Sequence, residues 1–110
     1  MGSISKMMKN DNKVGQLLGI ARKSGQIALG SRETLTKVRE GHCVLVIVAE
    51  DAGFRTKKML TDKCTHYSVT FKIWGCSNEL AKYLGKSRVS VVGINNKGMA
   101  NKLLSLLNDN

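Results

Sequence analysis

Hydrophobic side chains recur along this chain at two spacings, one helical and one extended. Val14, Leu18 and Ala21 lie three or four positions apart, which predicts a helix with one buried face. Residues 44–49 instead form an unbroken aliphatic run, which is typical of a strand covered on both faces. Patterns of these two kinds alternate to the end of the chain. The predicted helices cover residues 12–23, 31–40, 56–64, 77–84 and 99–107, and the predicted strands cover residues 26–29, 44–49, 69–73 and 88–94.

This alternation of helices and strands predicts an α/β fold. We expect a three-layer αβα sandwich, in which a four-stranded mixed sheet carries helices on both faces. The 110 residues show no internal repeat or linker, and this length suits one hydrophobic core rather than two. We therefore expect a flexible N-terminal tail over residues 1–11 and a single domain over residues 12–108. Ser31 and Ser77 stand at the start of two predicted helices, and we expect them to be the N-caps.

Basic residues greatly outnumber acidic ones. Lys and Arg total 18 against 8 Asp and Glu, which gives a formal net charge of +10. Such an excess on a small domain favours a polyanionic partner, with nucleic acid as the first candidate. An anionic membrane surface is the second candidate, but no predicted helix carries a continuous basic face. Residues 1–40 carry a net charge of +5 and residues 81–110 a net +4, so the two ends would form one basic surface if they fold to the same edge.

The segment that begins at Gly30 has several features that suit a phosphate group. Gly30 would let a nucleic-acid backbone approach closely, and the free N–H groups at the start of the following helix would bind a phosphate. Arg32 and Lys37 would add positive charge, and Glu33 would accept a hydrogen bond from a guanine edge. The same segment is also consistent with a capped helix that binds nothing.

A second basic segment, Lys-Ser-Arg at residues 86–88, lies in the turn before the last predicted strand. In isolation this pattern is typical of a solvated turn. In an alternating sheet, however, the turn can lie near the loop at Gly30, and its cations would then extend the same basic surface. The basic pair at residues 22–23 suits a helix C-terminus as well as it suits RNA. We expect the cations of residues 55–58 to be solvated.

The His and Cys residues suggest a zinc site at first sight, but their spacing argues against one. Cys43, Cys64 and Cys76 are far apart and form no C-x-x-C pair, which is typical of free thiols in a reducing cytosol. His42 and His66 do not complete a zinc-ligand spacing. The sequence also lacks a nucleophile elbow, a P-loop and a dinucleotide-binding glycine motif. We therefore expect no metal, no cofactor and no catalytic residue.

Two segments together carry a resemblance to a known family. Residues 29–36 (Leu-Gly-Ser-Arg-Glu-Thr-Leu-Thr) and residues 44–52 (Val-Leu-Val-Ile-Val-Ala-Glu-Asp-Ala) resemble the kink-turn RNA-binding ribosomal protein superfamily, which includes the archaeal L7Ae and L30e types. The order of predicted elements agrees over residues 12–108. Residues 61–64 (Thr-Asp-Lys-Cys) and residues 98–104 look especially like the small bacterial YlxQ-type members.

The resemblance implies an αβα sandwich that binds folded RNA through the start of the second helix and the turn before the last strand. The usual helix motif is Gly-Thr-Asn-Glu-Val-Thr-Lys, in which Asn and Glu read the sheared G·A pairs of a kink-turn. Gly30 and Glu33 match this motif, and Ser31 is a close substitute for Thr. Arg32 stands at the Asn position and Thr36 at the Lys position. Arg32 can donate hydrogen bonds but cannot accept them as Asn does.

We therefore expect a non-catalytic RNA-binding protein that recognises structured RNA, either kink-turn-like or ribosomal. The N-terminus lacks a signal-peptide core and no apolar run reaches the length of a membrane span, so we expect a cytoplasmic protein that binds no membrane. The resemblance implies a bacterial, ribosome-associated protein, which we expect to be a monomer. The alternative is a protein-interaction module of a ribosome-maturation or transcription complex, whose charge serves solubility. The residues expected to contact RNA are Gly30, Ser31, Arg32, Glu33, Thr36, Lys37, Lys86, Ser87 and Arg88.

Overall fold

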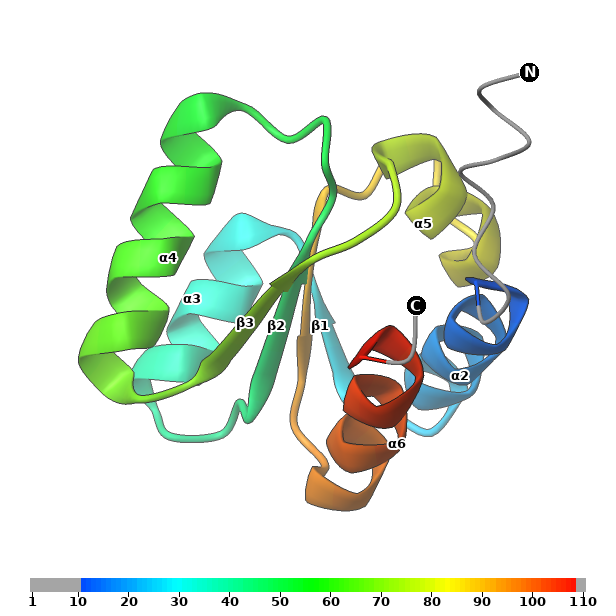
Figure 1. Ribbon diagram of the computed structural model, residues 1–110, viewed down its shortest axis with the longest axis horizontal. Helices are drawn as coiled ribbons and strands as arrows, with labels where there is room; N and C mark the ends of the chain where they lie inside the picture. Colours follow the sequence, from blue (N-terminus) through cyan, green and yellow to red (C-terminus); the bar gives the residue numbers. More distant parts are fainter. Residues whose placement is uncertain (1–10, 109–110) are drawn as a thin grey trace.

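The computed structural model describes residues 11–108, in which five helices alternate with four strands. The N-terminal tail predicted over residues 1–11 lies outside the described residues, apart from Asp11, which is the first residue of a helix. The order of elements along the chain is the one that the hydrophobic spacing predicts (Figure 1). The elements are α2 (Asp11–Lys23), β1 (Ile27–Leu29), α3 (Ser31–Arg39), β2 (Leu45–Val48), α4 (Phe54–Tyr67), β3 (Thr70–Ile73), α5 (Ser77–Leu84), β4 (Val91–Ile94) and α6 (Lys97–Asn108).

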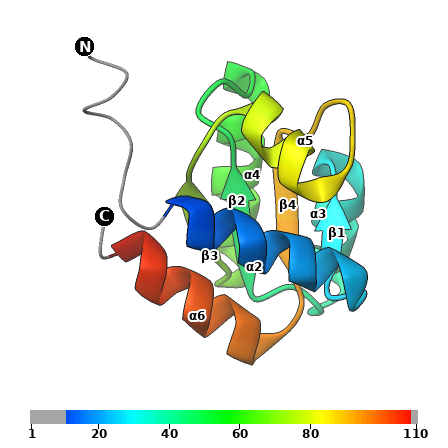
Figure 2. The same cartoon turned by 90° about the vertical axis from the view of Figure 1, so that its right-hand side faces the viewer.

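The four strands form one mixed sheet in the order β1-β4-β2-β3. β4 is antiparallel to both of its neighbours, whereas β2 and β3 are parallel. Helices α3 and α4 cover one face of this sheet, and α2, α5 and α6 cover the other (Figures 1 and 2). The predicted α/β architecture, with helices on both faces of a mixed four-stranded sheet, is therefore confirmed.

The central strand β2 explains why both faces must be covered. All four of its side chains are fully buried. Because successive side chains of a strand point to opposite faces, Leu45 and Ile47 pack with α2, α5 and α6, whereas Val46 and Val48 pack with α3 and α4. β4 is buried in the same way along its whole length. Each face therefore has its own hydrophobic core, and a helical layer excludes water from each.

Several boundaries differ from the prediction. α4 runs from Phe54 to Tyr67 and ends at Ser68, whose backbone is left-handed with φ 59°. β4 begins at Val91 rather than at residue 88, because its ladder with β2 starts at the pair Val91–Val48. Both predicted N-caps are wrong, since Gly30 precedes α3 and Cys76 precedes α5. The two predicted cap serines are the first residues inside their helices.

Helix α3 packs closely on β4, because Gly93 of that strand has no side chain. A Cβ atom at Gly93 would lie 2.9 Å from the Thr34 methyl carbon Cγ2 and 3.0 Å from the Cys43 Sγ atom. Thr34 is fully buried at this contact, and its hydroxyl has no hydrogen-bond partner within the described part of the chain. The close packing of helix and strand therefore depends on glycine at position 93.

Replacing Gly93 with alanine is expected to destabilise the protein by about 1–3 kcal/mol, because α3 would have to move away from the sheet. Chemical denaturation followed by circular dichroism measures this change. Gly53→Ala is the matched control, since a Cβ at Gly53 meets nothing within 4 Å and its φ of −62° suits any residue. Equal unfolding free energies for the two variants would show that the close approach at Gly93 does not contribute to the stability of the fold.

Candidate nucleic-acid interface

The start of α3 and the turn before β4 meet at an open hollow of about 540 Å³. The Gly30 N–H group donates a 2.8 Å hydrogen bond to the Val91 carbonyl oxygen, which ties the two segments together. The two basic segments, which about fifty residues separate along the sequence, are thus neighbours in space. The residues that line the hollow are Leu29, Gly30, Ser31, Glu33, Thr56, Lys86, Arg88, Val89, Ser90 and Val91.

The first turn of α3 presents open backbone donors to this hollow. Gly30 has φ 91° and ψ 159°, a conformation that a residue with a side chain rarely adopts. Thr34 donates the first intrahelical bond, 3.1 Å long, to the Gly30 carbonyl oxygen. The N–H groups of residues 31–33 precede this bond and so have no acceptor inside the helix. Free N–H groups of this kind at a helix N-terminus suit an anion such as phosphate.

Glu33 stands between this hollow and a smaller cavity. Its carboxylate accepts a 3.2 Å hydrogen bond from the Leu29 N–H group, which holds the side chain beside the end of β1. The smaller cavity, of about 190 Å³, is also lined by Lys37, His42 and Asn95. Because Glu33 remains exposed, its carboxylate oxygens are accessible to a ligand in the hollow.

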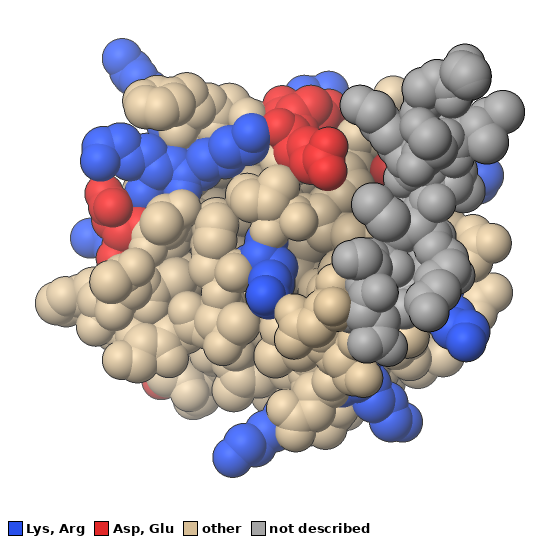
Figure 3. Space-filling view, in the orientation of Figure 1, with Lys and Arg blue, Asp and Glu red and all other residues tan. Residues whose placement is uncertain are grey.

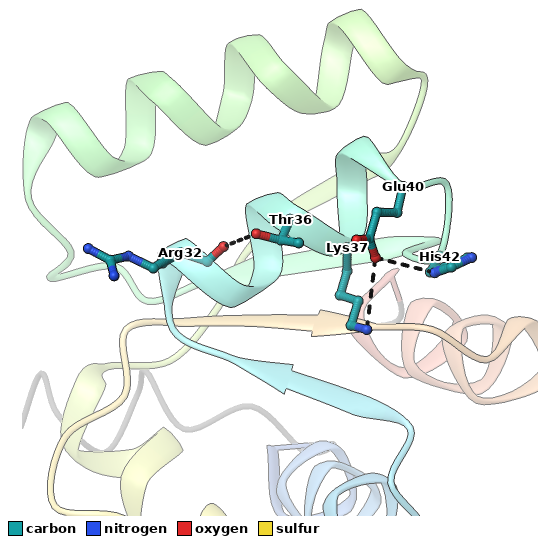
Figure 4. Close-up of polar contacts among 5 residues, drawn as sticks. All are labelled: Arg32, Thr36, Lys37, Glu40 and His42. Carbon is teal, nitrogen blue, oxygen red and sulfur yellow. Dashed lines mark hydrogen bonds and ion pairs between the residues drawn. The ribbon is translucent and has the colours of Figure 1, made fainter.

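The remaining residues predicted on α3 are not brought together with the hollow. Figure 4 shows Arg32 pointing away from the helix at its first turn, while Lys37 and His42 lie with Glu40 near its other end. Lys37 Nζ lies 4.0 Å from Glu40 Oε1, and His42 Nδ1 lies 3.5 Å from the same oxygen. The Thr36 hydroxyl donates a 3.1 Å hydrogen bond to the Arg32 carbonyl oxygen. Its hydroxyl proton is therefore used within the helix.

In the turn before β4, Lys86 and Arg88 line the hollow. Ser87 lies between them and is exposed, but it does not line the hollow. The turn thus brings two exposed cations to the open donors of α3. This arrangement is a positively charged edge with a helix N-terminus at its centre.

A polar network behind the hollow was not foreseen from the sequence. Asp51 Oδ1 accepts hydrogen bonds from the Ser77 N–H group (2.8 Å) and from the Ser77 hydroxyl (2.9 Å). The Ser77 oxygen lies 2.8 Å from the Ser90 hydroxyl oxygen, so Ser90 donates the remaining proton. Asp51 thereby links the loop after β2 to the start of α5 and, through Ser77, to Ser90, which precedes β4 and lines the hollow.

This network changes the acidity of Asp51. The Ser77 N–H and then the Ser77 hydroxyl stabilise the carboxylate and lower the pKa of Asp51 below its usual 3.8. The positive charge of Arg88 lowers this pKa further. Arg88 is therefore attracted to the network that supports its own turn.

The ionised form of Asp51 favours the folded protein, because folding lowers its pKa. This stabilisation is complete above the ordinary pKa of 3.8 and is lost as the pH falls through the lower pKa of the folded state. We expect Asp51→Asn, which keeps an acceptor oxygen, to make the unfolding free energy less dependent on pH below pH 3.8. Urea denaturation at a series of acidic pH values measures this dependence. Glu50→Gln serves as the control, and equal flattening in both variants would contradict the role of Asp51.

Helix α4 adds further basic residues beside this edge. Figure 3 shows Lys and Arg side chains gathered over the amino-terminal half of α4, where Thr56 reaches the hollow. Lys57 Nζ donates a hydrogen bond to the Glu50 carbonyl oxygen. Lys58 Nζ lies 3.5 Å from Asp62 Oδ2 and forms an ion pair with it. These two cations therefore have partners in the protein.

The thiols and histidines do not form a metal site among residues 11–108, where no group of three His, Cys, Asp or Glu side chains converges. Cys43 and Cys64 are buried. Burial raises the pKa of Cys64 to about 11, and that of Cys43 is raised for the same reason. Both thiols therefore stay protonated and unreactive at neutral pH. Within the same described range, no helix is both long and hydrophobic enough to cross a membrane.

Comparisons with known proteins relate this chain to a family of ribosomal and RNA-binding proteins. The sequence pattern of the ribosomal protein L7Ae/L30e/S12e/Gadd45 family matches residues 12–104. The chain is 36% identical over 91 residues to the RNA-binding protein YlxQ of Bacillus subtilis, which covers 83% of this chain and 91% of that protein. It is 31% identical over 104 residues to the large ribosomal subunit protein eL30 of Eremothecium gossypii, covering 89% and 95% of the two chains.

A solved structure supports the same relationship. A protein of unknown function from Bacillus halodurans superimposes with a TM-score of 0.85 at 35% identity, covering 87% of this chain and 97% of the other. Sequence and structure thus agree over nearly all of the described residues. The chain belongs to the ribosomal protein L7Ae/L30e/S12e/Gadd45 family.

Proposed function

We propose that this protein binds structured RNA, of the kink-turn type or within ribosomal RNA, at the hollow between the start of α3 and the turn before β4. The observation that carries the proposal is the meeting of open N–H groups at residues 31–33 with the cations Lys86 and Arg88 in one hollow. Relatives named as RNA-binding or ribosomal proteins support it. The protein acts without catalysis, as a monomer, in the cytoplasm and in association with the ribosome.

Each group at the hollow has a role that follows from its chemistry. Gly30 leaves space for the RNA backbone, since nothing lies within 4 Å of where its Cβ would be. The N–H groups beyond it bind a phosphate. Glu33 accepts hydrogen bonds from a base edge, and Lys86 and Arg88 neutralise phosphates along the RNA. Specificity therefore rests on Glu33, and most of the affinity rests on the cations.

The other predicted residues contribute in different ways. Arg32 lies at the first turn of α3 and is exposed, so it can donate to a phosphate or to guanine. Lys37 is offset from the hollow and shares Glu40 with His42. We assign it to the margin of the interface, where Thr36 and Ser87 also lie.

Two variants separate base recognition from charge. We expect Glu33→Ala to reduce the preference for a kink-turn RNA over a random duplex by about tenfold or more, because one base contact discriminates by about 1–3 kcal/mol. We expect Arg88→Ala to weaken binding to both RNAs and to reduce the slope of log affinity against log salt by about 1. Mobility shift at several salt concentrations measures both quantities.

Lys102→Ala removes an exposed charge from α6 and is the control for net charge. Equal salt slopes for the wild type, Glu33→Ala and Arg88→Ala would contradict these assignments. Failure of the wild type to prefer any structured RNA over a random duplex would overturn the proposed function itself.

The Arg at position 32 offers a test of kink-turn recognition. Asn combines an acceptor with donors, so Arg32→Asn is expected to raise the preference for a kink-turn over a duplex while it lowers overall affinity. Arg39→Asn is the matched control, because it removes the same charge from the other end of α3. The ratio of the two affinities in a binding titration gives the result, and an unchanged or smaller ratio in Arg32→Asn would contradict the proposed contact.

A further inference from the structure

A second hollow lies on the opposite helical layer, in a groove of about 560 Å³ between α2 and α5. The two helices lie side by side on the face that Figure 2 presents. Gly19, Ile20 and Tyr83 contribute to its floor, whereas the charged residues on its rim are Arg22, Lys23 and Lys82. Within residues 11–108, no acidic side chain lines this groove.

The shape of the groove follows from two glycines of α2. A Cβ at Gly15 would lie 2.2 Å from the Tyr83 ring, so the ring packs directly on the helix backbone. A Cβ at Gly19 would lie 3.2 Å from the Tyr83 carbonyl oxygen. The Tyr83 hydroxyl donates a 3.0 Å hydrogen bond to Asn12, which fixes the ring. The Tyr83 ring is therefore held against α2, and the three cations at the groove come from both helices.

These cations are available to a ligand. Arg22, Lys23 and Lys82 are exposed, and the ion pairs of residues 11–108 involve none of them. Each of the three lies in the last turn of its helix, where a cation also suits the helix dipole. The helix dipole explains why a cation stands at the end of each helix. It does not explain why the ends of both helices line one groove in which no acidic side chain of residues 11–108 balances their charge.

The groove and the hollow at α3 adjoin in the chain at consecutive residues. Gly85 lines the groove, and the next residue, Lys86, lines the hollow. Arg22 reaches across to this junction, since its Nη1 atom lies 3.6 Å from where a Cβ of Gly85 would be. A cationic track therefore leads from Arg88 through Lys86 to Arg22 and on to Lys82.

We infer that this groove binds the phosphate backbone of a helical stem that extends from the RNA held at α3. The inference rests on the proposed function, and it enlarges the RNA surface to a second helical layer. Backbone contact fits the groove better than base contact, because its charged groups are long, exposed cations and its aromatic ring is packed on Gly15. The position of the groove next to the hollow favours RNA over an acidic peptide, which would need no neighbouring RNA site.

The test compares two RNAs that share one kink-turn core, one with short stems and one with each stem lengthened by a helical turn. The wild type is expected to bind the long RNA more tightly and with a steeper salt dependence. The double variant Arg22→Ala/Lys82→Ala is expected to bind the long RNA roughly three- to thirtyfold more weakly. This is the loss expected when two exposed ion pairs with phosphates are removed. Its salt slope should fall by about 2. Its affinity for the short RNA should equal that of the wild type.

The double variant Lys97→Ala/Lys102→Ala removes the same charge from exposed positions on α6 and should keep the wild-type affinity for both RNAs. Thermal unfolding checks that each variant is folded. If the wild type binds both RNAs with equal affinity, or if both double variants lose the same affinity for the long RNA, the groove does not bind a stem. Neither result contradicts RNA binding at α3. Binding of an acidic peptide that Arg22→Ala/Lys82→Ala abolishes, with RNA affinity unchanged, would also overturn the inference. If neither RNA binds the wild type, the proposed function fails first.

Discussion

The packing of α3 on β4 is the contact on which the rest of the interface depends. At Gly93 the helix lies directly on the strand, with Thr34 filling the space that a side chain would occupy. One turn earlier, the Gly30 N–H group bonds to Val91 of the same strand. These two contacts set the height of the helix above the sheet and the point where it begins. The open donors of α3 therefore face the turn that enters β4, and the hollow results.

The order of the elements could be predicted because burial is nearly complete in the central strands. A strand covered on both faces, such as β2, must be apolar at every position, and this pattern is local. The helix starts could not be predicted as well. Glu33 and Glu79 each bond a backbone N–H group just before their helix, so carboxylates satisfy donors at these positions. The N-cap positions themselves are Gly30 and Cys76, so the serines expected as caps are one residue inside their helices.

The site could be predicted only in part, for a related reason. The proximity of the two basic segments could be predicted, because the alternation of helices and strands places their loops at the same edge of the sheet. The tie between Asp51 and Ser77 joins residues 26 positions apart and depends on how the loop after β2 meets α5, which no local pattern encodes. Lys37 lies beside Glu40, toward the other end of α3 from its first turn (Figure 4), so it remains a prediction at the margin of the site.

The acidic residues explain why a positive edge remains available for a polyanion. Asp51 and Glu79 bond N–H groups at the start of α5, while Glu40 and Asp62 pair with cations away from the hollow. Their charges are thus placed where backbone donors or other side chains need them. Arg88 is attracted electrostatically to Asp51, but it lines the hollow and remains exposed. The network therefore orients the turn before β4 and leaves its cations free to meet a phosphate backbone, which net charge alone would not ensure.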